Sequence, residues 1–235
     1  MRLGIMQPYF FPYIGYFSLI KHVDRFIILD EVQFIRHGWI ERNRIKKQSE
    51  GWQYISVSLQ KHSQKTLIKD IKINNSVEWK NKILAQLSHY KKAPYYNNVI
   101  GILEDVFRYN GESITELDMI TLKKVAEYLN IETPIQLYSD LGLEIEEVKA
   151  ADEWALHICN AMNQVTEYWN PSGGQSFFDR TKYENAGINL YFQEMELLPY
   201  KQFGNKFEKA LSILDVMMFN NVDDIHFLLD RYQLK

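Results

Sequence analysis

The chain has 235 residues, of which 46% are hydrophobic and 24% charged, as in a globular protein with a sizeable core. Its formal net charge of −3 argues against a general nucleic-acid or membrane-surface protein. The one cysteine, Cys159, excludes an intramolecular disulfide and is typical of a reducing compartment. No secretory leader and no apolar run of ~20 residues is recognisable, so we expect a cytoplasmic protein without a membrane span.

The first thirty residues predict a strand, a helix and a second strand. Residues 2–6 form an apolar run that stops at Gln7 and Pro8, because proline cannot continue a strand ladder. Residues 14–23 carry apolar side chains at helical spacing, and residues 25–31 form another apolar run that ends in acids. This order is typical of a βαβ unit with parallel strands.

The rest of the chain mixes strands and helices, with the helices concentrated in the middle. We therefore predict an α/β fold, a mainly parallel sheet flanked by helices, in a single domain over residues 1–235. Residues 77–130 form a helical insertion, with a separate helical subdomain as the alternative. Further strands are expected at 52–59, 67–73, 165–171 and 187–195, and helices at 76–92 (capped by Ser76), 99–107, 113–130 (capped by Ser113 and Glu116), 151–164 and 209–220.

The turn after the first strand is one candidate site. Parallel α/β sheets bind ligands at the carboxyl ends of their strands, where Gln7, Asp30 and Gln33 would lie. Gly15 would allow close backbone approach at the start of the following helix, whose amides favour anions. The alternative is that the aromatic residues here belong to the core and the prolines shape a turn.

Residues 36–72 hold nine Lys and Arg against three acids. Arg36, Arg42 and Arg44 surround Trp39 and Asn43 in this stretch. Arginine suits phosphate or carboxylate because its planar group forms two parallel hydrogen bonds, and tryptophan can stack on a base. A solvated basic loop is the alternative interpretation.

The stretch 171–179 (PSGGQSFFD) follows another predicted strand. Ser172 and Gly173 there could cradle a phosphate, although the pattern lacks the residues of a Walker loop and a tight turn is the simpler interpretation. The histidines show no metal-binding spacing, and Cys159 lies at an apolar helical position that favours the core over a nucleophile. Neither a metal nor a cofactor is expected.

Several short motifs, in a fixed order along the chain, resemble those of a known protein family. MQPYFFPYIGYF, then DEVQFIRHGWIERNRIK, then YKKAPYY, SGGQSFFD and PYKQ, resemble the WbqC-like family over nearly the whole length. His37 departs from the family pattern, in which arginine or lysine is more common. The matching anchors are Gln7, Pro8, Pro12, Tyr13, Gly15, Tyr16, Phe17, Asp24, Asp30, Gln33, Arg36, Trp39, Arg42 and Asn43.

The resemblance implies a transferase of O-antigen (lipopolysaccharide) or other surface-polysaccharide biosynthesis. Such an enzyme would attach glycine or another acyl group to the amino group of a nucleotide-linked amino sugar. The acyl or aminoacyl donor stays open, with an aminoacyl-tRNA and ATP plus an amino acid as two candidates. Asp30 is then the expected base, with His37 second and Gln7 beside them. Substrate contacts are expected from Tyr9, Tyr13, Gly15, Tyr16, Gln33, Arg36, Trp39, Arg42, Asn43, Arg44, Ser172 and Gly173.

Two other classes of function fit parts of the sequence. The strand, proline-aromatic turn, helix and strand are similar in outline to HIGH-type nucleotidylyltransferases, with Tyr13 and Tyr16 in place of the histidines. That reading predicts ATP-dependent nucleotidyl transfer or adenylation. A non-catalytic sugar-binding scaffold is the third class, and a homo-oligomer fits any of the three.

Overall fold

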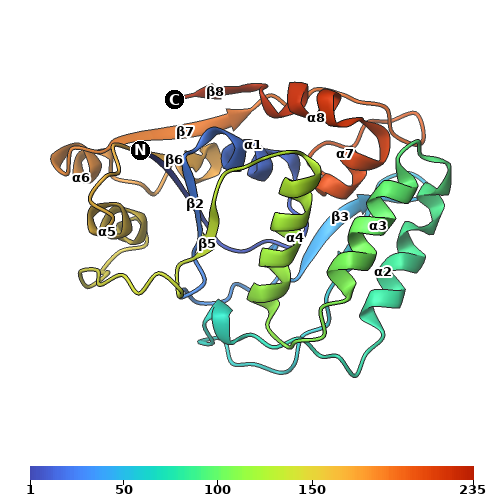
Figure 1. The fold of residues 1–235 in the computed structure, drawn as a ribbon, viewed down its shortest axis with the longest axis horizontal. Coiled ribbons are helices and arrows are strands. Elements are labelled where there is room, and N and C mark those ends of the chain that lie inside the picture. Colours follow the sequence, from blue (N-terminus) through green and yellow to red (C-terminus); the bar gives the residue numbers. More distant parts are fainter.

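The computed structural model describes residues 1–235, which form eight strands, eight helices and three short 3₁₀ turns (Figure 1). In chain order these are β1 Arg2–Met6, α1 Ile14–His22, β2 Arg25–Ile28, β3 Arg42–Lys46, β4 Trp52–Ser56, η1 Ile68–Asp70, α2 Trp79–Leu87, η2 Ser88–Lys92, α3 Tyr96–Phe107, α4 Ile114–Tyr128, β5 Ile135–Leu137, α5 Glu153–Ala161, β6 Glu167–Pro171, η3 Ser172–Gly174, α6 Arg180–Asn185, β7 Asn189–Met195, α7 Ile213–Phe219, α8 Val222–Leu229 and β8 Tyr232–Leu234.

A six-stranded sheet forms the centre of the molecule, in the order β5-β2-β1-β6-β7-β8. The first five strands are parallel, and β8 joins the edge antiparallel to β7. The predicted α/β class with a mainly parallel sheet is therefore confirmed, as is the parallel βαβ unit at the start of the chain.

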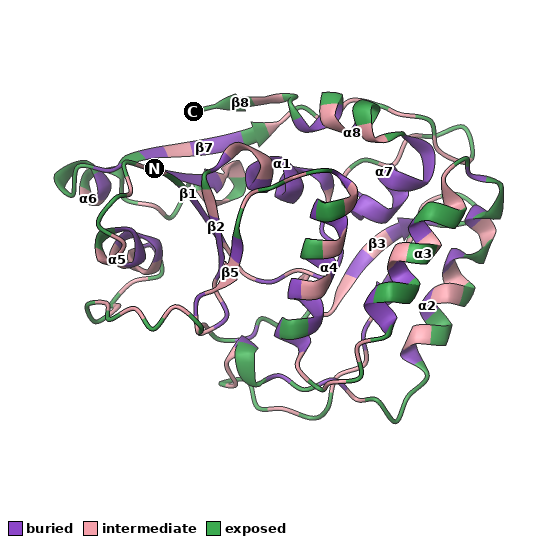
Figure 2. Cartoon of the chain, viewed as in Figure 1, coloured by how far each residue is buried: buried purple, intermediate pink, exposed green.

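The sheet separates two hydrophobic cores, because successive side chains of a strand point to opposite faces. On β2, Phe26 and Ile28 join the larger core, which includes α1, α4 and α7, whereas Ile27 faces the smaller core under α5 and α6. On β6, Trp169 belongs to the larger core and Tyr168 to the smaller core. The two groups of helices lie on either side of the sheet in Figure 1, and their buried faces turn toward it in Figure 2. This arrangement leaves the carboxyl ends of the strands for a site.

The middle helices α2, α3 and α4 lie together at one side of the molecule (Figure 1). Their buried residues Ile83, Leu103 and Leu122 belong to the same hydrophobic cluster as Phe26 and Ile28 of the sheet. The division of the chain into domains stays a prediction.

Two local expectations are wrong. Residues 67–73 form the 3₁₀ turn η1 and isolated bridges in place of a strand, since their buried residues Ile68, Ile71 and Ile73 do not alternate regularly. Ser76 does not cap α2, because its backbone amide and its hydroxyl both donate to the Asn74 side chain. Ser113 does cap α4, accepting a hydrogen bond from the Glu116 amide.

Candidate functional site

The sheet order places a topological switch point between β1 and β6. From β1 the chain passes through α1, on the face of the larger core, to β2 on one side of β1. From β6 it passes through α6, on the face of the smaller core, to β7 on the other side of the β1–β6 pair. β1 and β6 are parallel neighbours, so their carboxyl ends lie side by side while their connections diverge. In open α/β sheets, ligands bind in the crevice that forms at such a point.

A cavity of about 890 Å³ lies at these strand ends. Met6 from the end of β1 and Asn170 and Pro171 from the end of β6 line it, and Trp154 of α5 forms part of its wall. The lining is largely apolar and aromatic with a few polar side chains, which is typical of a small-molecule site. We call it the main cavity.

The main cavity brings together predicted residues from three distant segments. The opening turn, the loop 33–39 and the Gly-rich turn all reach it, and each contributes both a polar group and an apolar or backbone surface. The predicted residues that line it are Gln7, Tyr9, Tyr13, Gln33, Trp39, Ser172 and Gly173.

Tyr9, Tyr13 and Trp39 also line a smaller adjoining hollow of about 170 Å³, together with Asn43 and Arg44. Burial raises the pKa of both tyrosine hydroxyls, so they stay protonated at neutral pH and can donate hydrogen bonds. These rings offer flat faces for a base or sugar, with a hydroxyl at the end of each tyrosine.

Arg44 is the predicted arginine closest to this site. Its guanidinium lies 5.3 Å from the ring centre of Trp39 and 5.1 Å from that of Trp52, and it donates to the Ala210 carbonyl at 3.0 Å. Its Nε is buried and has no hydrogen-bond partner. A guanidinium that lies beside this hollow and near two aromatic rings is suited to an anionic group there.

Tyr16 and Gly15 support the site without lining it. Tyr16 is buried, and its hydroxyl donates to the Gln7 carbonyl at 2.8 Å, which fixes the turn that carries Gln7. A Cβ on Gly15 would lie 2.4 Å from the Tyr13 ring. Alanine at this position would therefore force the tip of the Tyr13 side chain to move away from α1.

Arg42 and Asn43 also act as braces. Arg42 donates to the His37 carbonyl at 2.6 Å and to the Gly38 carbonyl at 3.2 Å, and stacks on Tyr54 at 4.1 Å. It thereby holds a turn in which His37 has a left-handed φ of 63°. Asn43 is buried and donates to the Phe10 carbonyl at 3.1 Å.

Arg36 and His37 lie away from the main cavity. They line a second cavity of about 510 Å³ with Glu41 and His62, on the other side of the loop 33–39. The three arginines that were expected around Trp39 and Asn43 are thus divided among three positions, with Arg44 alone at the smaller hollow.

Asp30, the predicted base, is buried at the end of β2. Its carboxylate accepts hydrogen bonds from the Ser139 hydroxyl at 2.6 Å and the Ser139 amide at 3.1 Å. Burial raises the pKa of Asp30, while the Ser139 hydrogen bonds act in the opposite direction. Ser139 is half-buried, and neither Ser139 nor Asp30 lines the main cavity.

Sequence reasoning missed Asn170, Trp154 and Ser139. Asn170 bonds the Tyr168 hydroxyl at 2.6 Å, and its Oδ1 would lie 2.4 Å from a Cβ on Gly174, so the second glycine makes room for this amide. The sequence does carry a signal for Asn170, because this asparagine lies at the end of an apolar strand and shortly before two glycines. Nothing local marked Trp154 or Ser139.

Other classes of site find little support in the structure. No group of three or more His, Cys, Asp or Glu side chains is placed to hold a metal ion. Cys159 is buried in the smaller core as predicted, and burial raises the pKa of its thiol to about 12. No helix has the length and apolar character needed to cross a membrane.

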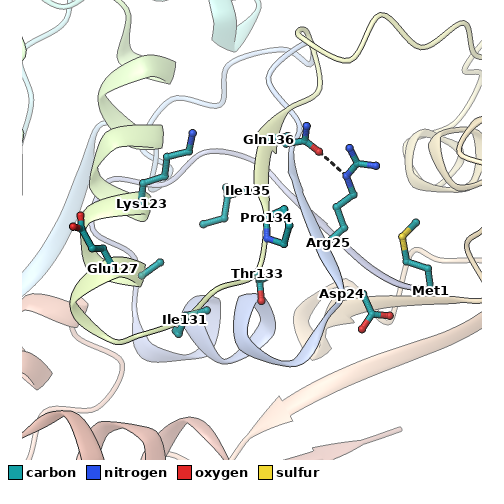
Figure 3. Close-up of a pocket in the computed structure, with 11 residues that line it drawn as sticks. Met1, Asp24, Arg25, Lys123, Glu127, Ile131, Thr133, Pro134, Ile135 and Gln136 are labelled. Carbon is teal, nitrogen blue, oxygen red and sulfur yellow. Dashed lines mark hydrogen bonds between the residues drawn. The ribbon is translucent and has the colours of Figure 1, made fainter.

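A further hollow of about 680 Å³ lies between α4 and the start of β5 (Figure 3). Lys123 and Glu127 form one wall, and Arg25, which donates to Gln136 at 2.5 Å, forms the other. It is at the amino ends of the strands, the edge opposite to the main cavity. Its position does not match the ligand site expected of this topology.

Comparison with known proteins agrees with the motifs. A model of the WbqC-like protein family matches residues 7–227. The chain is 30% identical over 226 residues to the uncharacterized protein Rv1507c of Mycobacterium tuberculosis, with 93% of each chain covered. No solved structure matches. The chain belongs to the WbqC-like protein family.

Proposed function

We propose that this protein is a transferase of surface-polysaccharide biosynthesis that joins an amino acid, glycine foremost, to the amino group of a nucleotide-linked amino sugar. The observation that carries the proposal is the main cavity at the switch point, with its tyrosine and tryptophan faces and few polar groups. Family membership supports the pathway, because the WbqC-like family is associated with O-antigen biosynthesis.

The shape of the site fits two parts of such a substrate. The sugar would lie in the main cavity, where Gln7, Gln33 and Asn170 offer donors and acceptors for hydroxyl groups. The nucleotide would enter the adjoining hollow, with its base against Tyr9, Tyr13 or Trp39 and its pyrophosphate near Arg44. Tyr9, Tyr13 and Trp39 border both spaces, so the two parts of one extended ligand would contact the same three rings.

The reaction requires an activated donor, an aminoacyl ester of tRNA or an aminoacyl-adenylate. The sugar nitrogen attacks the carbonyl carbon of the donor, a C–N bond forms, and the C–O bond to the tRNA or adenylate breaks. The amine proton passes to a base and the leaving oxygen departs with its electron pair. Asp30, at the strand end between the lining residues Leu29 and Val32, would act as that base, and backbone amides of the Ser172–Gly174 turn would stabilise the oxyanion.

The test is a thermal-shift screen followed by product analysis. We expect nucleotide-linked 4-amino sugars to raise the melting temperature more than the same sugars without the amino group. Incubation with glycyl-tRNA, or with ATP and glycine, should then add one glycyl residue to the sugar by mass spectrometry. A shift with ATP alone would favour adenylation. Saturable sugar binding without any product from either donor would favour a scaffold and overturn the transferase proposal.

A further inference from the structure

Three segments of the chain carry a local excess of positive charge. Residues 42–53, 88–95 and 200–210 hold nine Lys and Arg against two acids, Glu50 and Glu208. The rest of the chain holds the other 18 of the 27 Lys and Arg but 28 of the 30 Asp and Glu. A protein with a formal net charge of −3 thus concentrates positive charge in these segments, which we call the basic surface.

Hydrogen bonds join the three segments beside the candidate site. The Arg44 guanidinium donates to the Ala210 carbonyl at 3.0 Å, and both residues line the smaller hollow. The Lys46 ammonium donates to the Lys206 carbonyl at 2.6 Å, so the third segment lies across the β3–β4 hairpin. The Lys46 amide donates to the Tyr90 hydroxyl at 2.9 Å, which brings η2 beside β3. The basic surface is therefore one region of the molecule, and it begins at the smaller hollow.

Most of the lysines on the basic surface have no ionic partner. Only Lys206 forms a salt bridge, a long one of 3.8 Å to Glu50. Unpaired ammonium groups in water attract phosphates with little competition from the protein itself. The exposed lysines are Lys47, Lys91, Lys92, Lys201, Lys206 and Lys209.

Aromatic rings lie among these cations on the β3–β4 hairpin. Strand register pairs Lys46 with Trp52 and Arg44 with Tyr54, so the four side chains share one face of the hairpin. The ring centres of Trp52 and Tyr54 are 5.0 Å apart, and the Arg44 guanidinium lies 5.1 Å from that of Trp52. Trp52 is 36% exposed. An exposed tryptophan among cations is suited to stacking on a nucleic-acid base.

We propose that the basic surface binds a single-stranded nucleic acid, the 3′ end of an aminoacyl-tRNA. Its phosphates would pair with the exposed lysines and a base would stack on Trp52. The identification as tRNA rests on the proposed function, and it selects the aminoacyl-tRNA over the aminoacyl-adenylate as donor. Lys47 and Trp52 line neither the main cavity nor the smaller hollow, so the nucleotide of the sugar and the RNA would use different side chains.

Other polyanions fit this surface less well. A membrane surface would be met by several protruding apolar side chains, whereas Trp52 is the one exposed large hydrophobic residue of the three segments. A duplex is recognised through its backbone and shape, and its paired bases give Trp52 no free face to stack on. A free nucleotide could engage few of the exposed lysines. A single strand uses both the cations and the ring.

The experiment is fluorescence anisotropy on the full chain with a short single-stranded RNA that ends in CCA, and with a duplex of the same sequence. We expect the single strand to bind more tightly, with an affinity that falls as salt rises. Trp52→Ala should weaken binding by about fivefold to a hundredfold. Phe227→Ala removes an exposed ring far from the surface in sequence and should leave binding unchanged.

The lysines are tested through the salt dependence. The double variant Lys47→Gln/Lys209→Gln should reduce the slope of log affinity against log salt by about 1.4, since each lost phosphate contact on a single strand contributes about 0.7. Lys123→Gln/Lys149→Gln makes the same charge change at two exposed positions outside the basic surface and should keep the wild-type slope. Melting temperatures of all variants establish that they fold.

Three results would overturn the inference: equal affinity for the single strand and the duplex, wild-type affinity in Trp52→Ala, or binding to phosphatidylglycerol vesicles without binding to RNA. Product assays separate it from the proposed function. If the RNA binds but neither glycyl-tRNA nor ATP with glycine yields a glycyl sugar, the proposed function fails and RNA binding stands. If Trp52→Ala uses glycyl-tRNA as efficiently as the wild type, the transferase stands and the RNA site falls.

Discussion

Gly15→Ala isolates how α1 supports the candidate site. In a helix, alanine is more favourable than glycine by at most about 1 kcal/mol. Here the added Cβ would lie 2.4 Å from Cζ and Oη of Tyr13, closer than real contacts allow, so the Tyr13 ring must move. Overpacking of this kind costs roughly 1–3 kcal/mol. The difference predicts a net loss of about 0–2 kcal/mol in the free energy of unfolding, because the displaced atoms are at the tip of the Tyr13 side chain.

The larger effect should be on ligand binding. Tyr13 lines both the main cavity and the smaller hollow, so a shift of its ring changes both spaces at once. We expect Gly15→Ala to abolish or strongly reduce the thermal shift caused by nucleotide-linked sugars. Urea denaturation would measure stability, and the thermal-shift screen would measure binding in the same preparations.

Gly101→Ala is the matched control. Gly101 lies in α3, is exposed, and has no atom within 4 Å of the position of an added Cβ. This variant should gain about 0.5–1 kcal/mol and bind like the wild type. If Gly15→Ala is as stable as Gly101→Ala and keeps the ligand-induced thermal shift, the position of Tyr13 does not depend on glycine at position 15, which would refute the prediction.

Three further variants test other parts of the structure. Arg42→Ala should lower the free energy of unfolding by about 1–3 kcal/mol in urea, because it removes two charged hydrogen bonds and the Tyr54 stacking, whereas a residue that only contacts ligand would leave stability unchanged. Ser139→Ala should raise the pKa of Asp30 further and move the rising limb of the pH–rate profile to higher pH, and an unmoved limb would argue against Asp30 as the base. Asp118 is fully buried with both carboxylate oxygens unpaired, and burial raises its pKa well above 3.8, so the folded protein loses stability as pH rises above that value. The free energy of unfolding of Asp118→Asn should therefore exceed that of the wild type at about pH 7, and the difference should disappear toward about pH 4. The exposed control Glu132→Gln should show no such change with pH. If both variants differ from the wild type by the same amount at every pH, Asp118 is ionised in the fold.

The beginning of the fold could be predicted because its signals are local. An apolar run of strand length, a proline stop and helical spacing together specify β1, α1 and β2, and parallel pairing follows from their order. β3 was missed because its inward residues include Asn43 between two arginines, which hides the alternation of buried and exposed positions. β5 has three residues, too few to show any period.

The position of the candidate site follows from the order of the strands, whereas the contacts of its individual residues do not. The edge of the sheet follows from strand order, so Gln7, Gln33 and Ser172 could be expected near one another. Ser139 could not, because it reaches Asp30 through the pairing of β2 with a strand more than a hundred residues later, which no local pattern encodes.

The dense opening motif contains residues that line the site and residues that hold the lining in place. The Tyr13 ring lies where a side chain on Gly15 would otherwise be, and the Tyr16 hydroxyl holds Gln7 by donating to its carbonyl from within the core. Arg42 does the same for the turn that carries His37. Substitutions of such braces should change stability and binding together, whereas substitutions of lining residues such as Gln33, which is exposed and bonds only the Gln64 carbonyl, should change binding alone. A strongly patterned motif can therefore mark a site without each of its residues touching the ligand.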